Sequence, residues 1–215
     1  MRLYAVADIH ARPARIERVR AGVRQFEPDV LVVAGDIGSY INPNGVYSQL
    51  NDLGIPVLTV RGNSDRRWHD QCLCRYENIL SLHLRPVSIR GVSFAGISGA
   101  VPVPFRTRVA FREKRLFEAA AGVISDETIL VVHPPPFGTL DRVLGRLSAG
   151  SKGVARLVAA RRPRMVLCGH IHEHTGVEKT GDTLVVNCSI AHGSNGAVID
   201  FDGPAASIVP AVTMV

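Results

Sequence analysis

The chain has 215 residues, of which 46% are hydrophobic, and this is enough to bury a sizeable core in one domain over residues 1–215. The net charge of +6 and the sequence pI near 9.5 exclude an acidic protein and suit an anionic substrate, but do not by themselves indicate nucleic-acid binding. No apolar stretch reaches the roughly 18 residues that span a bilayer, and the first apolar run starts directly after Arg2, which leaves no room for a signal peptide. We therefore expect a cytoplasmic protein with no membrane partner.

The N-terminal part of the chain alternates apolar runs with a helical pattern. The runs are short and rich in Val, Ile and Leu, which is typical of buried parallel strands. They cover residues 3–7, 30–34 and 57–60, and a helical spacing of apolar residues covers residues 15–26. Each run ends in polar residues, which are in turn Asp8-Ile9-His10, Gly35-Asp36 and Gly62-Asn63-Ser64-Asp65.

The rest of the chain continues this alternation and adds hairpins. Two further apolar runs end in His133 and in Gly169-His170 with His172; they cover residues 129–132 and 165–168. Helical spacing recurs over residues 115–124 and 152–160. Paired short runs around turn residues predict antiparallel units, which are 87–89 with 92–95, 176–179 with 183–187, and 197–201 with 207–209. We expect these hairpins to supply a second sheet.

The polar clusters follow five separate runs, each at the carboxyl end of a predicted strand. In open α/β sheets, ligands bind in the crevice beyond those ends. We therefore expect the clusters to meet at one place and to form the functional site.

The residue types in these clusters are typical of a metal site. Aspartate, histidine and asparagine offer oxygen and nitrogen ligands suited to manganese, iron, zinc or nickel, and the absence of cysteine argues against a structural zinc site. A carboxylate shared by two cations can hold them roughly 3.5 to 4 Å apart, where together they activate water and neutralise charge on a phosphoryl group. Asp36 follows its strand alone and is the natural shared carboxylate, although such an aspartate taken singly would more often cap a helix.

The order of the motifs, Asp-x-His, Gly-Asp, Gly-Asn-x-Asp, His and Gly-His-x-His, resembles the calcineurin-like metallophosphoesterase superfamily over residues 3–189. The resemblance implies an α/β fold, a four-layer α/β/β/α sandwich of two mixed β-sheets flanked by helices. It also implies two divalent metal ions, with Mn²⁺ favoured over Fe, Zn or Ni. One metal would be held by Asp8, His10, Asp36 and His172, and the other by Asp36, Asn63, His133 and His170.

Other stretches refine the resemblance. Residues 165–173 with 185–189, and the sequence His133-Pro-Pro-Pro-Phe137, are similar to a branch of small bacterial, archaeal and animal phosphoesterases related to cyclic-nucleotide phosphodiesterases. The implied activity is hydrolysis of a small phosphodiester, a cyclic or linked nucleotide, by a hydroxide that bridges the two metals. The implied catalytic residues are Asp36, Asn63, Asp65 and His170, with Asp65 orienting its neighbours without touching metal.

Ser64 departs from the superfamily pattern. Many members have a histidine between the asparagine and the acidic residue, where it can protonate the leaving oxygen. Serine is not a general acid near neutral pH, and general-acid help is typically worth about 10²- to 10⁴-fold, so its loss matters most for poor leaving groups. Superfamily members that lack this histidine are biased toward phosphodiesters over monoesters, so the resemblance implies a phosphodiesterase, with His174 or His192 as candidate replacement donors.

The candidates for substrate contact are Arg12, Ser64, Arg66, His174 and His192. The two arginines lie on loops leaving the same predicted sheet edge and would pair with phosphate through their planar guanidinium groups; the alternative is that they are solvated surface residues. The loops 39–45 and 99–108 are either a substrate wall or plain connectors. Two further histidines, His69 and His83, lie away from strand ends and are expected to be structural or exposed.

Three other functions stay open. A nuclease of the same superfamily is encouraged by the basic pI, but a chain of this length lacks the extra DNA-binding segments those enzymes usually carry. A phosphomonoesterase stays open if water or His192 compensates for Ser64. A scaffold that keeps the fold without metal chemistry belongs to another class, and the presence of every expected ligand argues against it. The oligomeric state is left undetermined.

Overall fold

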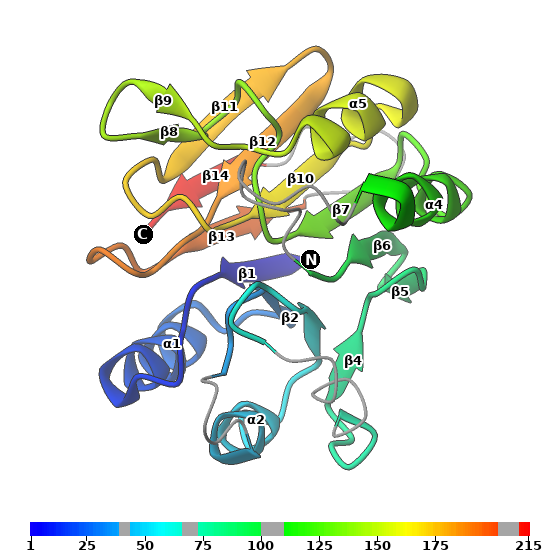
Figure 1. Ribbon diagram of the computed structural model, residues 1–215. Coiled ribbons are helices and arrows are strands. Elements are labelled where there is room, and N and C mark those ends of the chain that lie inside the picture. Colours follow the sequence, from blue (N-terminus) through cyan, green and yellow to red (C-terminus); the bar gives the residue numbers. More distant parts are fainter. Residues whose placement is uncertain (39–43, 66–72, 100–109, 202–210) are drawn as a thin grey trace.

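A computed structural model describes residues 1–38, 44–65, 73–99, 110–201 and 211–215. Two β-sheets pack face to face, with α1 and α2 against the outer face of one sheet and α4 and α5 against the outer face of the other (Figure 1). The predicted α/β fold of two mixed sheets flanked by helices is confirmed. Within the described ranges, no helix combines the length and the apolar character needed to cross a bilayer.

The first sheet has the strand order β14-β13-β1-β2-β3-β4. Strands β1 to β4 run parallel to one another, whereas β13 is antiparallel to both β1 and β14. The strands are β1 Arg2–Val6, β2 Val30–Ala34, β3 Val57–Val60, β4 Ile79–Ser81, β13 Ala197–Asp200 and β14 Ala211–Met214; its helices are α1 Pro13–Phe26 and α2 Asn44–Asn51.

The second sheet has the strand order β11-β12-β10-β7-β6-β5. Its four inner strands are parallel, and each edge strand pairs antiparallel with its neighbour. The strands are β5 Val87–Ile89, β6 Val92–Ile97, β7 Thr128–Val132, β10 Met165–Cys168, β11 Gly176–Thr180 and β12 Thr183–Asn187; its helices are α4 Ala110–Ala121 and α5 Lys152–Arg161. A separate hairpin is formed by β8 Arg142–Val143 and β9 Leu147–Ser148.

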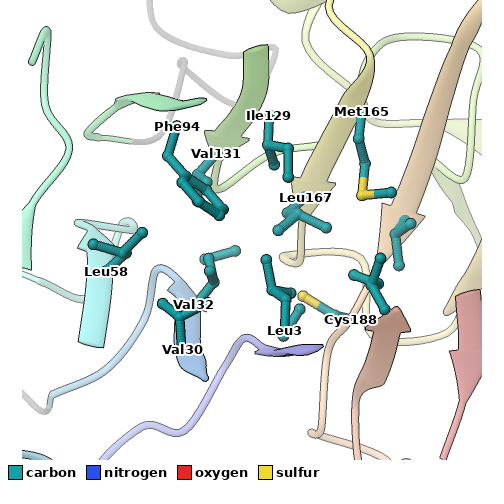
Figure 2. Close-up of a cluster of buried hydrophobic side chains, with 14 of the residues drawn as sticks. Leu3, Val30, Val32, Leu58, Phe94, Ile129, Val131, Met165, Leu167 and Cys188 are labelled. Atoms are coloured by element: carbon teal, nitrogen blue, oxygen red, sulfur yellow. The ribbon is translucent and has the colours of Figure 1, made fainter. Parts of the chain in front are cut away.

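The hydrophobic core has three layers, because the central strands are buried on both faces. Successive residues of a strand point to opposite faces, so on β2 Val30 and Val32 pack between the two sheets, while Leu31 and Val33 pack under the helices. Figure 2 shows the layer between the sheets, where Val30 and Val32 face Leu167 and its neighbours on the second sheet. This double burial explains the unbroken apolar runs in the sequence.

The two sheets are joined at the carboxyl ends of their central strands. Ala7, just past β1, pairs in parallel with Ser189, just past β12. The Ala7 amide donates to the Cys188 carbonyl at 3.0 Å, and the Ile190 amide donates to the Ala7 carbonyl at 3.1 Å. This pairing places the loops from both sheets side by side, where the polar clusters were predicted to meet.

Some expectations about individual elements were wrong. The third hairpin does not join the second sheet: β13 pairs with β1 and extends the first sheet. Its partner is β14 at Ala211–Met214, whereas the predicted partner, residues 207–209, lies outside the described residues. Residues 44 and 45 of the predicted loop 39–45 begin α2. The helix predicted at 115–124 is α4 and ends at Ala121, because Gly122 follows and glycine is a poor helix former.

Candidate metal centre

The loops that leave β1, β2 and β10 hold their polar residues in left-handed backbone conformations. The φ angles are 64° at Asp8, 53° at His10, 52° at Asp36 and 69° at His170. Such conformations are unfavourable for residues other than glycine and persist where surrounding bonds enforce them. Here the Asp8 amide donates to the Gly35 carbonyl at 3.1 Å, and the His10 amide donates to the Asp36 carbonyl at 2.8 Å. Four of the predicted ligands therefore have strained backbone conformations, each in a loop that follows a strand.

Asp8 forms the buried floor of the cluster. Its side chain is fully buried, and among the described residues its Oδ1 atom is the one buried side-chain oxygen or nitrogen with no hydrogen bond. Three histidine Nε2 atoms surround Oδ1, at 3.3 Å for His172, 3.8 Å for His10 and 3.9 Å for His133. Metal–ligand bonds of about 2.0–2.2 Å place neighbouring ligand atoms roughly 3 to 3.5 Å apart. A lone buried carboxylate oxygen is costly, so this arrangement fits a cation among these atoms.

Asp36 lies beside Asp8 and is almost as deeply buried. Its Oδ2 atom is 3.4 Å from Nε2 of His133 and 3.6 Å from Nε2 of His10. The ligand atoms form two compact groups, one of Asp8, His10 and His172 and one of Asp8, Asp36 and His133. Asp8 belongs to both groups, and Asp36, to which the resemblance gives the shared position, also lies 3.6 Å from His10 of the first group.

Asn63 and His170 complete the cluster on its solvent side. Asn63 Oδ1 lies 3.0 Å from Nε2 of His133, and the ring of His170 meets that of His133 edge-on with centroids 5.0 Å apart. The backbone amide of His170 donates to Asp8 Oδ2 at 3.1 Å. The structure thus brings together every predicted metal ligand, namely Asp8, His10, Asp36, Asn63, His133, His170 and His172.

The histidines of the cluster differ in the direction in which their pKa values are shifted. Burial opposes ionisation of Asp36, but the hydrogen bond and charge of His133 outweigh it and hold the carboxyl pKa below its ordinary value. Burial also opposes the charge of His133, yet Asp36 and Asp8 together raise the pKa of His133 to about 9. Burial, followed by the charge of His133, lowers the pKa of His170 to about 4. At neutral pH the metal-free cluster therefore has a protonated His133 and a neutral His170.

Asp65 connects the loops that follow β2 and β3. Its carboxylate accepts hydrogen bonds from the amides of Ile37 at 3.2 Å, Gly38 at 2.9 Å and Gly62 at 2.9 Å. A carboxylate that accepts several amides fixes the loops that carry them. These contacts are compatible with the role predicted for Asp65, which is to orient neighbouring ligands.

Ser64 points into the cluster. Its hydroxyl donates to Asp36 Oδ2 at 2.9 Å and lies 3.4 Å from Nδ1 of His10. The backbone amide of Ser64 also donates to Asp36 Oδ1 at 2.7 Å. With 8% of its surface exposed, Ser64 supports a carboxylate and has little surface for substrate.

The other predicted substrate contacts lie in different places. His192 is exposed at the rim, its ring edge-on to that of His172 with centroids 5.5 Å apart. The Nδ1 atom of His174 accepts a hydrogen bond from the amide of Arg142 in β8 at 3.2 Å. Arg12 is exposed just before α1. The remaining candidate, Arg66, lies outside the described residues, as do residues 39–43 and 100–108 of the two predicted wall loops.

Two residues that support the site were missed in the sequence. Asn187, at the end of β12, donates through Nδ2 to the carbonyls of Ile171 at 2.8 Å and His174 at 3.0 Å, and so holds the turn that carries His170 and His172. A polar residue at the end of a buried strand was a usable signal for it. Arg15 donates to the Asp8 carbonyl at 2.7 Å, and its place in a helix rich in arginine gave no such signal.

Comparisons with known proteins bear on the family and the fold. A family model described as a calcineurin-like phosphoesterase superfamily domain matches residues 1–198. An uncharacterized protein of Methanocaldococcus jannaschii is 29% identical over 200 residues, which cover 88% of each chain. The crystal structure of TT1561 of Thermus thermophilus matches 99% of this chain and 98% of its own, with a TM-score of 0.69 and 16% identity. A structure described as a novel archaeal phosphodiesterase matches 100% of both chains, with a TM-score of 0.59 and 12% identity. Both structures are similar to this chain in fold.

Proposed function

The chain belongs to the calcineurin-like phosphoesterase superfamily, and from this premise we propose that it is a metal-dependent phosphoric ester hydrolase that prefers small phosphodiesters. The observation that supports the metal site is the buried Oδ1 atom of Asp8, which has no hydrogen bond and is surrounded by the Nε2 atoms of three histidines. Such a donor set of imidazole and carboxylate suits a divalent transition metal.

We propose that the cluster holds two metal ions, with Mn²⁺ as the favoured metal. The ligands of the first would be Asp8, His10, Asp36 and His172, and the ligands of the second would be Asp36, Asn63, His133 and His170. Asp8 Oδ1 also lies 3.9 Å from Nε2 of His133. Asp8 is therefore a second candidate for a carboxylate shared by both ions. The chemistry that bound divalent ions supply at such a site is neutralisation of charge on phosphoryl oxygens and a lowered pKa of water.

A backbone contact fixes the orientation of His133 toward the cluster. Its Nδ1 atom lies 2.9 Å from the Ala34 carbonyl oxygen, which can only accept, so Nδ1 carries a hydrogen and Nε2 is the atom turned toward the cluster. Asn63 is exposed and lies on the solvent side of the cluster. His170 is neutral at neutral pH because burial and His133 lower its pKa to about 4, and it therefore offers a nitrogen lone pair.

The preference for diesters follows from Ser64. The superfamily histidine that this serine replaces can protonate a leaving oxygen, and general-acid help is worth about 10²- to 10⁴-fold. The Ser64 hydroxyl donates instead to Asp36, so that position provides no proton to substrate. Substrates whose leaving group needs no proton are favoured. Within the proposed class of cyclic or linked nucleotides, a linked nucleotide that releases a phosphate group fits this best, whereas the sugar hydroxyl released by a cyclic nucleotide would need its proton from another group.

One observation favours a second candidate, a phosphomonoesterase. The exposed ring of His192 lies edge-on to that of His172, with centroids 5.5 Å apart. A histidine at this rim is placed to meet the leaving group of a bound ester and can supply the proton that Ser64 does not. The His192→Ala variant distinguishes the two candidates, because it should reduce monoester cleavage more than diester cleavage if His192 is the donor.

The direct test compares hydrolysis of bis-p-nitrophenyl phosphate with that of p-nitrophenyl phosphate, with added Mn²⁺ and with a chelator. We expect metal-dependent cleavage of the diester at a higher kcat/KM than the monoester. Asp8→Asn, which keeps the size of the side chain but removes its charge, is the matched inactive control. Equal cleavage of both esters would support the monoesterase, and no cleavage of either with Mn²⁺ present would contradict the proposal.

A further inference from the structure

Two arginines on one face of α1 reach the segment that follows β12, residues 189–195, which we call the rim loop. Arg15 lies in the first turn of the helix, and Arg18 lies one turn later. The Nη1 atom of Arg18 donates to the carbonyl oxygens of Ile190 and Ser194, both at 3.0 Å. Both of these acceptors lie in the rim loop.

Arg15 makes a different connection. Its Nη1 atom donates to the Asp8 carbonyl at 2.7 Å, and its Nη2 atom donates to the Ala191 carbonyl at 3.0 Å. One planar guanidinium therefore joins the loop after β1, which carries Asp8, to the rim loop, which carries His192. Lysine has a single terminal amine and cannot reproduce a fork of this kind.

The burial and the hydrogen-bond partners of Arg15 indicate that it holds these two loops in place. The side chain is 8% exposed, and within the described parts of the chain its hydrogen bonds go to backbone carbonyls and no carboxylate forms an ion pair with it. Burying a charge is costly unless its donors are satisfied. The carbonyl that Arg15 meets belongs to Asp8, whose backbone is held at a left-handed φ of 64°.

We propose that Arg15 is a positioning residue that holds the Asp8 backbone and the rim loop in one arrangement, whereas Arg18 orders the rim loop alone. The binding of metal by Asp8 and the placement of His192 are thereby coupled through one guanidinium. This inference rests on the proposed function, because it takes Asp8 as a metal ligand.

The test compares Arg15→Gln with Arg18→Gln, two identical changes on the same helix. Each metal-free variant is titrated with Mn²⁺ by calorimetry, and its kcat and KM for bis-p-nitrophenyl phosphate are measured with saturating Mn²⁺. Loss of a contact that orients a ligand typically costs about 10- to 100-fold in metal affinity, so we expect Arg15→Gln to raise the Mn²⁺ Kd by a factor in that range. Arg18→Gln should raise KM and leave the Mn²⁺ Kd at the wild-type value.

Arg15→Lys and Arg18→Lys repeat the comparison with the charge kept, and they decide the matter if Arg15→Gln does not fold. Arg15→Lys should raise the Mn²⁺ Kd less than Arg15→Gln, since one of two carbonyls can still be reached, and Arg18→Lys should leave it unchanged. A wild-type Kd in both Arg15 variants would overturn the inference, as would equal weakening by the Arg15 and Arg18 changes. A wild-type protein that binds no Mn²⁺ would overturn the proposed metal site itself.

Discussion

The hydroxyl of Ser64 donates a hydrogen bond to Oδ2 of Asp36 at 2.9 Å, and the Ser64 amide donates to Oδ1 of the same carboxylate at 2.7 Å. Ser64, which stands where many superfamily members have a histidine, is thus hydrogen-bonded to a proposed metal ligand. Hydrogen bonds to a charged acceptor are stronger than those between neutral groups, so Ser64 holds the Asp36 carboxylate in one orientation.

Ser64→Ala should therefore reduce activity without changing substrate preference. The lost bond orients Asp36, and such losses cost about 10- to 100-fold in metal affinity or activity, while the hydroxyl takes no part in proton transfer to the leaving group. We expect kcat/KM to fall by a similar factor for the diester and the monoester. Ser88→Ala, at an exposed position of β5, is the control. A changed ratio of diester to monoester cleavage would argue against this role.

The metal-free protein should be most stable near pH 6.5. Because the pKa of His133 is raised from 6.5 to about 9, its contribution to stability is complete below pH 6.5 and is lost as the pH rises through about 9. Because the pKa of His170 is lowered from 6.5 to about 4, its contribution is complete above pH 6.5 and is lost as the pH falls through about 4. Urea unfolding with a chelator, measured across this range, gives the profile.

The two limbs of that profile can be assigned by substitution. His170→Gln removes a group that binds a proton more readily in the unfolded chain than in the folded state, so the fall in the free energy of unfolding below pH 6.5 should become shallower. The limb above pH 6.5 should remain, because His133 is untouched. A free energy of unfolding that keeps rising through pH 9 would contradict the raised pKa of His133.

Metal binding should release a proton from His133. Nitrogen ligands must be deprotonated to bind metal, and the Nε2 atom of His133 faces Asp36 and Asn63 with an imidazolium pKa of about 9. At neutral pH we expect about one proton to leave per chain from this histidine when Mn²⁺ binds. Calorimetric titrations in two buffers of different ionisation enthalpy measure that number. The release should shrink as the pH rises through 9, and a release independent of pH would exclude His133 as its source.

Gly169→Ala should weaken both stability and metal binding. A Cβ atom at this position would lie 2.7 Å from Asp8 Oδ2 and would also overlap the Ala7 side chain. Overpacking of this kind typically costs about 1–3 kcal/mol, and here the displaced group is a proposed ligand. Gly45→Ala is the matched control, because it lies in α2 with nothing within 4 Å of the added atom. Equal thermal stability and Mn²⁺ affinity in the two variants would refute the steric argument.

The ligand loops could be predicted from sequence because their signal is local. A polar residue directly after an apolar run marks a strand end, and parallel strands bring such ends to one edge. That reasoning reached His133 and Asp36 on opposite sheets, whose side chains lie 3.4 Å apart. The rule itself applies within one sheet, and the pairing of Ala7 with Ser189 is what brings the strand ends of the two sheets together.

Features that depend on distant parts of the chain could not be predicted in this way. The position of β13 beside β1 depends on which sheet has a free edge, and the three-residue β4 is too short to show a period. Sharing of Asp8 between both ligand groups depends on side-chain geometry at the junction of the sheets. Arg15 has the same appearance in sequence as a solvated helix arginine, and only its contact with the Asp8 carbonyl distinguishes it.

A dinuclear site is tested most directly by the number of Mn²⁺ ions bound per chain, measured by calorimetry together with hydrolysis of bis-p-nitrophenyl phosphate on the same metal-free sample. We expect two ions per chain, with hydrolysis that develops as the second ion binds, and loss of both signals in Asp8→Asn. Binding of a single ion with full activity, or hydrolysis that persists in the presence of a chelator, would contradict a dinuclear site built on Asp8 and Asp36.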